Sequence, residues 1–175
     1  MRRREKMTKK LRNITTKSLE VLAGASLLAM VILTTWQVFT RYLLHSPSSW
    51  SEELVSYLFA FASLFGAAIV SGERNHMNIP VLVEKMNHKL QILFGVLAEI
   101  VALIFAGAIL IYGGVKISTL AMGQMTSALS VPIGIFYVVM PVTGILILLY
   151  SVLNIIEIIK GDITPLPSHE ESEDK

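Results

Sequence analysis

The sequence predicts an all-α membrane protein with four transmembrane helices, a short amphipathic helix at the membrane surface and both termini in the cytoplasm. Three observations support this class. Of the 175 residues, 53% are hydrophobic. These residues gather in long runs, whereas a water-soluble domain buries its core by periodic patterning. Each run is long enough to cross a bilayer, which takes about 20 residues. Finally, Lys and Arg are distributed very unevenly between the segments that join the runs.

Four spans follow from these runs. They are predicted over residues 19–44, 53–72, 91–117 and 131–159, within a membrane domain of residues 18–160. The first run is far longer than the ~7–15 apolar residues of a signal peptide and is therefore predicted to be an uncleaved span. Residues 1–17 form a basic tail. Residues 161–175 form an acidic tail with Pro165 and Pro167, which we predict to be disordered.

Local signals place the helix ends. Ser49 and Glu52 have the spacing of a capping box, so the second helix is predicted to begin at Trp50 or Ser51. Apolar residues at helical spacing predict an amphipathic interfacial helix over residues 79–90, either separate from the third span or continuous with it. Pro141 is expected to kink the fourth span.

The distribution of cations gives the orientation. Eight Lys or Arg residues lie in the first 17 residues, three lie between the second and third spans, and two follow the fourth span. The other side holds only Arg41 and Lys116. One side therefore holds thirteen Lys or Arg residues and the other side two. This difference predicts a cytoplasmic N-terminus, because cytoplasmic segments carry the excess of cations. Beside an apolar span, the basic tail indicates membrane orientation rather than binding to nucleic acid.

Polar and small residues recur on single helix faces. They are Met30, Thr34, Gln37 and Arg41 in the first span; Glu52, Ser56, Ala60, Ser63, Ala67 and Ser71 in the second; Gly95, Glu99, Ala102, Ala106 and Gly113 in the third; and Gly144, Ser151 and Asn154 in the fourth. Small residues let membrane helices approach closely. The stripes therefore predict helix packing, either within the chain or against another protein.

Charged residues in or beside the spans have two interpretations each. Glu99 is the one acid well inside a span, and it is either a proton or cation carrier or a structural acid bonded to a neighbouring helix. We favour the structural role, because no second buried acid accompanies it to form a relay. Arg41 lies across a short loop from Glu52 and Glu53, which predicts an ion pair that closes the loop.

Several kinds of chemistry are excluded. The chain has no cysteine, so it has no thiolate metal site or cysteine nucleophile. None of the four histidines lies in the middle of a span, which disfavours haem. The sequence has no glycine-rich phosphate loop and no GxSxG motif. We therefore expect no enzymatic activity, no cofactor and no metal.

These features together resemble a known family. The first span ends at Arg41-Tyr42, and Trp50-Ser51-Glu52-Glu53-Leu54 opens the second, as in the small DctQ-type membrane subunit of tripartite ATP-independent periplasmic (TRAP) transporters. The resemblance continues through Gly66-Ala67-Ala68 and Arg74-Asn75-His76 and covers residues 19–159 with falling specificity. Pro80 stands where members often have an acid.

The resemblance implies a function and partners. Such a subunit resides in the bacterial inner membrane and supports a large permease subunit that moves an organic anion by a sodium-driven elevator motion. A periplasmic binding protein delivers the anion, usually a dicarboxylate or a sialic acid. Trp50, Glu52, Glu53 and the loop from Ser118 to Ser130 would contact the binding protein. The residues expected at partner interfaces or in structural roles are Gln37, Arg41, Trp50, Glu52, Glu53, Ser56, Ser63, His76 and Glu99.

Two alternatives remain open. The first is a self-contained small exporter that couples transport to protons through Glu99. The second is an accessory subunit of a membrane redox complex, which a haem absorbance band would reveal. The chain lacks the inverted repeat and the pair of broken helices expected of an autonomous secondary transporter.

Overall fold

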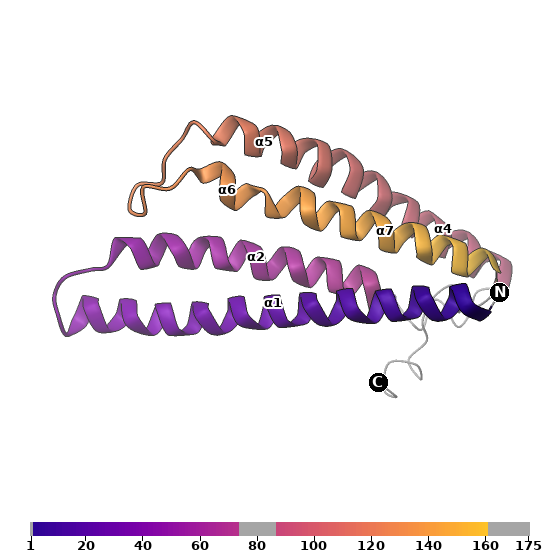
Figure 1. Cartoon of the computed structure of the whole chain (residues 1–175), viewed down its shortest axis with the longest axis horizontal. Helices are drawn as coiled ribbons and strands as arrows, with labels where there is room; N and C mark the ends of the chain where they lie inside the picture. The colour runs from indigo at the N-terminus through magenta and orange to yellow at the C-terminus, as the bar shows by residue number, and fades with distance from the viewer. Residues whose placement is uncertain (1, 74–86, 161–175) are drawn as a thin grey trace.

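The structure, a computed structural model, describes residues 2–73 and 87–160 and is built from helices (Figure 1). The elements are α1 (Arg2–Tyr42), α2 (Ser49–Glu73), α4 (His88–Phe105), the π-helix η1 (Ala106–Gly113), α5 (Gly114–Ala121), α6 (Ile133–Tyr137) and α7 (Val139–Lys160). Four stretches are long and apolar enough to cross a membrane: Arg12–Tyr42, Ser49–Gly72, Lys89–Ala121 and Ile133–Ile159. The four predicted spans are therefore confirmed.

The spans lie side by side and alternate in direction (Figure 1). We call the end where α1 begins and α7 finishes the terminal end. The opposite end, with the connections 43–48 and 122–132, is the loop end. Helix α7 packs against η1, α4 and α2, whereas α1 packs mainly against α2. The bundle is thus two helix pairs that meet where α2 contacts α7.

Helix boundaries differ from the predictions in ways that local chemistry explains. The helix that contains the first predicted span extends back to Arg2, since no Pro or Gly interrupts the basic segment. The second begins at Ser49, one or two residues early, so Ser49 lies inside the helix and Ser51 Oγ donates to the carbonyl of Ser48 at 2.8 Å. The predicted interfacial helix over 79–90 lies mainly outside the described residues. Asn87 has extended backbone (φ −61°, ψ 144°), and α4 begins at His88.

The third and fourth spans are irregular where they meet. Pro141 has no N–H and its ring crowds the carbonyl four residues earlier. The regular helix of the fourth span is interrupted at Val138, between α6 and α7 and three residues before the proline, while the kink itself stays a prediction. The facing part of the third span is the π-helix. A Cβ at Gly144 would lie 2.7 Å from Leu110 Cβ, and one at Gly114 would lie 2.9 Å from Pro141 Cδ. Both contacts therefore require glycine.

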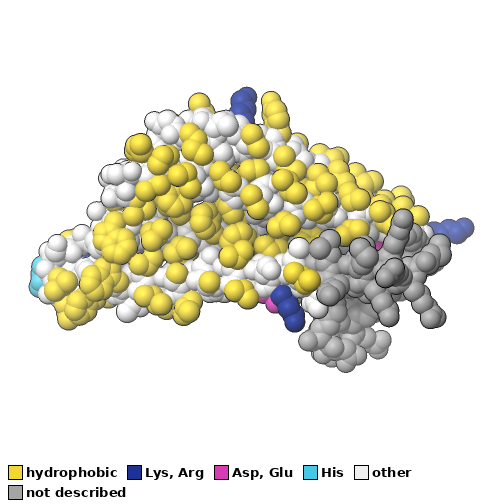
Figure 2. Space-filling model, viewed as in Figure 1, with side chains coloured by type: hydrophobic (Ala, Val, Ile, Leu, Met, Phe, Trp, Pro, Cys, Tyr) yellow, Lys and Arg dark blue, Asp and Glu magenta, His cyan; other side chains and the backbone are white. Residues whose placement is uncertain are grey.

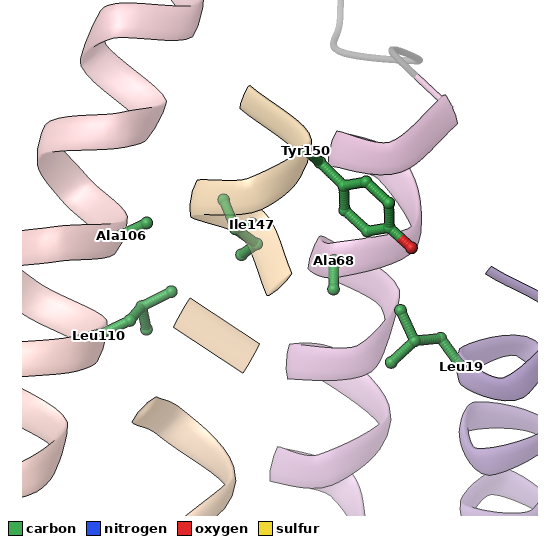
Figure 3. Close-up of a cluster of buried hydrophobic side chains, with 6 residues drawn as sticks. All are labelled: Leu19, Ala68, Ala106, Leu110, Ile147 and Tyr150. Carbon is green, nitrogen blue, oxygen red and sulfur yellow. The ribbon is translucent and has the colours of Figure 1, made fainter. Parts of the chain in front are cut away.

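A small apolar core joins all four spans (Figure 3). It consists of Leu19, Ala68, Ala106, Leu110, Ile147 and Tyr150. Ile147 points toward Ala106 and Leu110, while the Tyr150 ring lies toward Ala68 and Leu19 on the other side of α7 (Figure 3). Many large apolar side chains face outward instead, as Figure 2 shows; Leu28 is 63% exposed and Val31 is 61% exposed. An apolar exterior is what a bilayer requires of its protein surface.

Candidate functional site

Asn154 is the centre of a buried polar contact at the terminal end. Its side-chain NH2 group donates to the carbonyl of Ser71 at 3.1 Å and to Glu99 Oε1 at 2.9 Å. Asn154 is fully buried and Glu99 is 4% exposed. One side chain on α7 therefore connects α2 with α4. Asn154 is the only amide in the predicted fourth span, a signal by which its pairing with Glu99 could have been anticipated.

Side-chain hydrogen bonds satisfy two of the last carbonyls of α2, those of Ser71 and Gly72. The final four C=O groups of a helix have no hydrogen-bond partner within the helix, and in lipid no water is present to act as that partner. Asn154 bonds the Ser71 carbonyl, and Arg12 Nη2 donates to the Gly72 carbonyl. Arg12 also forms an ion pair with Glu157 at 3.2 Å. Side chains from α1 and α7 therefore cap the end of α2.

A tyrosine adds a second connection between α1 and α7. The Tyr150 hydroxyl donates to Thr15 Oγ1 at 2.7 Å and lies 3.4 Å from Thr16 Oγ1. Its ring packs so closely on Gly72 that a Cβ there would lie 3.2 Å from two ring carbons. Polar side chains thus connect all four spans at the terminal end. Neither Arg12 nor Tyr150 was singled out from the sequence.

Glu99 lies near one end of the bundle rather than at its middle. Its partner Asn154 contacts the carbonyl of Ser71, two residues before the end of α2. The other carboxyl oxygen, Oε2, has no hydrogen-bond partner, and the same holds for Asn154 Oδ1 and Ser151 Oγ. Within the described ranges, no group of three or more His, Cys, Asp or Glu residues could hold a metal ion.

At the loop end, Glu53 stabilises the segment 122–132. Glu53 Oε2 accepts hydrogen bonds from the backbone N–H groups of Ala128 at 2.9 Å and Leu129 at 3.2 Å. Thr126 closes the same segment: its N–H donates to the Val131 carbonyl at 2.9 Å, and its Oγ1 accepts from the Val131 N–H at 3.1 Å. Glu53 therefore points inward and fixes a loop, so the expected pair with Arg41 does not involve it.

Arg41 pairs with Glu52 instead. The closest N···O distance is 3.9 Å, and the two side chains are 58% and 71% exposed. Trp50 is also exposed, at 43%. Behind this surface, Tyr57 and Phe136 stack with ring centroids 3.9 Å apart and planes 5° apart. The loop end thus presents Arg41, Trp50 and Glu52 outward.

The small-residue stripes predicted in the third and second spans differ in burial. In the third span, Gly95, Glu99 and Ala106 are buried inside the bundle. In the second span, Ser71 at the end of the predicted stripe is buried. Four residues before it face outward, and we call them the outer stripe. They are Ser56, Ala60, Ser63 and Ala67.

The serines of the outer stripe bond only their own helix. Ser56 Oγ donates to the carbonyl of Glu52 at 3.1 Å and Ser63 Oγ to that of Phe59 at 2.8 Å. Of the other predicted site residues, Gln37 is half-buried and its Nε2 has no hydrogen-bond partner. His76 lies outside the described residues.

Comparison with known proteins gives consistent matches. The model of the family "Tripartite ATP-independent periplasmic transporters, DctQ component" matches residues 30–161. The chain is 36% identical over 105 residues to the sialic acid TRAP transporter small permease protein SiaQ of Vibrio cholerae, covering 60% of this chain and 61% of the relative. It is 35% identical over 80 residues to a TRAP transporter small permease protein of Haemophilus influenzae, covering 46% and 50%.

A third relative is a much longer protein. The chain is 31% identical over 72 residues to the sialic acid TRAP transporter permease protein SiaT of Haemophilus influenzae, which is 41% of this chain but 12% of that protein. In all three cases, the match spans less than two thirds of the relative.

Proposed function

Since the chain belongs to the DctQ family of TRAP transporter components, we propose that it is a supporting subunit for a larger permease chain. The family consists of transporter components, not enzymes. The four apolar spans fit a multi-pass protein of the bacterial inner membrane. In this role the subunit carries no substrate site of its own and enlarges the membrane-embedded surface of its partner.

The outer stripe is the structural observation that carries this proposal. Its four residues are exposed, and the hydroxyl groups of its two serines donate to carbonyls within α2. A Cβ added at neighbouring Gly66 would meet nothing within 4 Å. Small side chains on an outward face allow another helix backbone to come close, which is how helices associate in lipid. The outer stripe is therefore the proposed contact for a helix of the large permease.

The similarity to SiaT supports a lasting pairing. In that protein, a segment similar to this chain accounts for 12% of one longer polypeptide. A segment and the rest of its own chain remain together permanently. By analogy, a separate small subunit and a separate large permease form a stable complex.

The substrate, the energy source and the periplasmic partner also belong to the proposal. Two relatives are named as sialic acid transporters, which supports an organic anion of that class. Sodium binding and the elevator motion are assigned to the large permease. The N- and C-termini would be cytoplasmic, so Trp50, Glu52 and the 122–132 loop would face the periplasm, where a soluble binding protein docks. Uptake of labelled sialic acid, with and without sodium, by cells that contain all three proteins tests this assignment.

Co-purification tests the pairing itself. The tagged chain is extracted in mild detergent from membranes that also contain its large permease, and the recovered partner is quantified by mass spectrometry. Wild-type chain should recover a stoichiometric larger partner. The double variant Ala60→Leu/Ser63→Leu should recover at least about fivefold less, because added side-chain volume in a packed contact costs about 1–3 kcal/mol.

A control uses Ala108→Leu, which makes one of these two kinds of change, Ala to Leu, on an exposed position of η1. It should recover as much partner as wild type. If the outer-stripe variant recovered as much partner as wild type, the outer stripe would not be part of the interface. A wild-type chain that emerges alone or as a homodimer would contradict the supporting role altogether.

The exporter alternative makes a different prediction. If Glu99 carried protons, Glu99→Gln would abolish transport. We expect near-normal uptake, because Glu99 bonds Asn154 beside the end of α2 and a Gln side chain keeps an oxygen for that bond.

A further inference from the structure

Three unpartnered oxygens lie at the terminal end of the contact between α4 and α7. They are Glu99 Oε2, Asn154 Oδ1 and Ser151 Oγ, on residues that are 4%, 0% and 0% exposed. The Ser71 carbonyl fixes the orientation of the Asn154 amide, because a backbone carbonyl can only accept a hydrogen bond and therefore faces the NH2 group, which also donates to Glu99 Oε1. Oδ1 is therefore the free end of that amide.

The helix register brings these oxygens to the same contact. Asn154 meets Glu99, and Ile147 clusters with Ala106, so α7 runs antiparallel to α4. Ser151 lies on the same face of α7, one turn from Asn154 toward Ile147. It is therefore level with the turn of α4 that follows Glu99. No described hydrogen bond uses any of the three oxygens.

The local charges are negative. Glu99 brings a carboxyl group, and the C-terminal end of α2 directs its partial negative charge to the same place. Arg12, a cation beside the end of α2, is already engaged by Glu157 and the Gly72 carbonyl. A buried charge is costly unless it is paired. Helix C-terminal ends combined with oxygen side chains are also the way in which membrane transporters coordinate sodium.

We propose that Glu99, Asn154 and Ser151 bind one small monovalent cation of the sodium class at the end of α2. One carboxylate balances one positive charge, and all three donors are hard oxygen atoms, which suit non-transition cations. A multivalent ion would need further acids, and the described residues provide no cluster of three. The ion would hold α4 and α7 together beside the α2 cap. This site goes beyond the supporting role, and it is separate from the sodium binding assigned to the large permease.

Thermal unfolding of the purified full chain, without its partner, tests the site. Unfolding is followed by the fluorescence of Trp36 and Trp50 in NaCl, KCl or choline chloride at constant ionic strength. The wild-type midpoint should rise by about 3–5 °C between choline chloride and a saturating small cation, since an ion that binds only the folded state stabilises it. Identical midpoints in all salts would overturn the proposal.

Three variants locate the effect. Glu99→Gln keeps an acceptor for Asn154 but removes the charge, and it should lose the response to salt composition. Ser151→Ala should shift the half-maximal cation concentration severalfold upward. Glu157→Gln is the matched control, because it removes an acid at the same end that is already paired with Arg12; it should lower every midpoint and keep the difference between salts. A full response in Glu99→Gln would place the cation elsewhere and refute the site.

Discussion

The two ends of the bundle use polar residues in different ways. At the terminal end, Asn154, Arg12 and Tyr150 form bonds between helices, and two of them cap the carbonyls with which α2 ends. At the loop end, the inward bonds of Glu53 serve a single connecting segment, while Arg41 and Glu52 pair at the surface. The terminal end therefore depends on bonds between spans, and the loop end leaves its outer polar groups available to a partner.

A second contrast concerns small residues. The stripe of the third span is used internally, where Ala106 packs near Ile147 and Glu99 bonds Asn154. The outer stripe on α2 is exposed in the described part of the chain. Two similar sequence patterns thus serve one internal and one external surface, as expected of a subunit that must both fold and assemble.

The largest effect on stability is expected from Asn154→Leu. This change removes the donor from the buried Ser71 carbonyl and from Glu99, and each unsatisfied group costs about 1–3 kcal/mol. The free energy of unfolding in mixed micelles should fall by about 2–4 kcal/mol. Ser26→Ala is the matched control, because Ser26 Oγ bonds only the Leu22 carbonyl of its own helix; it should stay near wild type. If Asn154→Leu had the same free energy of unfolding as wild type, the terminal end would not be the main site of polar stabilisation.

Glu53→Ala should act locally on the other end. Its carboxylate accepts two backbone hydrogen bonds, and a charged acceptor contributes about 1.5–3 kcal/mol. Hydrogen exchange at the amides of Ala128 and Leu129 should therefore accelerate about 10- to 100-fold, with little change in global unfolding. Glu53→Gln, which keeps an acceptor oxygen, should show a smaller acceleration. Exchange in Glu52→Ala should match wild type, and an equal acceleration there would contradict a specific role for Glu53.

The sequence predicted the spans well, because a run of apolar residues is a local property. The partners of polar residues were harder to predict. Glu53 bonds residues 75 and 76 positions away, and Arg12 pairs with Glu157 across 145 positions. Nothing near Glu53 distinguishes it from Glu52, yet helix geometry turns one inward and the other outward. The break at Val138 was foreseeable from Pro141, whereas the close contact between Leu110 of the π-helix and Gly144 joins residues that are distant in the sequence.

Phe136→Leu should have a moderate effect at the loop end. It removes the stacked pair with Tyr57, and such pairs contribute about 0.5–1.5 kcal/mol beyond the area they bury. A double-mutant cycle with Tyr57→Leu, followed by unfolding in micelles, should yield a coupling energy of that size. Phe59→Leu serves as the control, because Phe59 on the same helix is 61% exposed. If the losses in the free energy of unfolding from Tyr57→Leu and Phe136→Leu were strictly additive, the stacked pair would not stabilise the contact between α2 and α6.

The smallest effect on stability is expected from the pair Arg41 and Glu52. Both side chains are mostly exposed and 3.9 Å apart, so solvent screening leaves the pair a coupling energy within about 0.5 kcal/mol of zero. Arg41→Gln, Glu52→Gln and the double variant should therefore unfold like wild type. If this surface meets a periplasmic partner, the same variants should slow uptake and weaken its salt dependence, because exposed charges act mainly on association rates. Normal uptake at low and high salt would leave the loop end without a docking role, whereas a loss of stability would mean that this end, too, depends on bonds between spans.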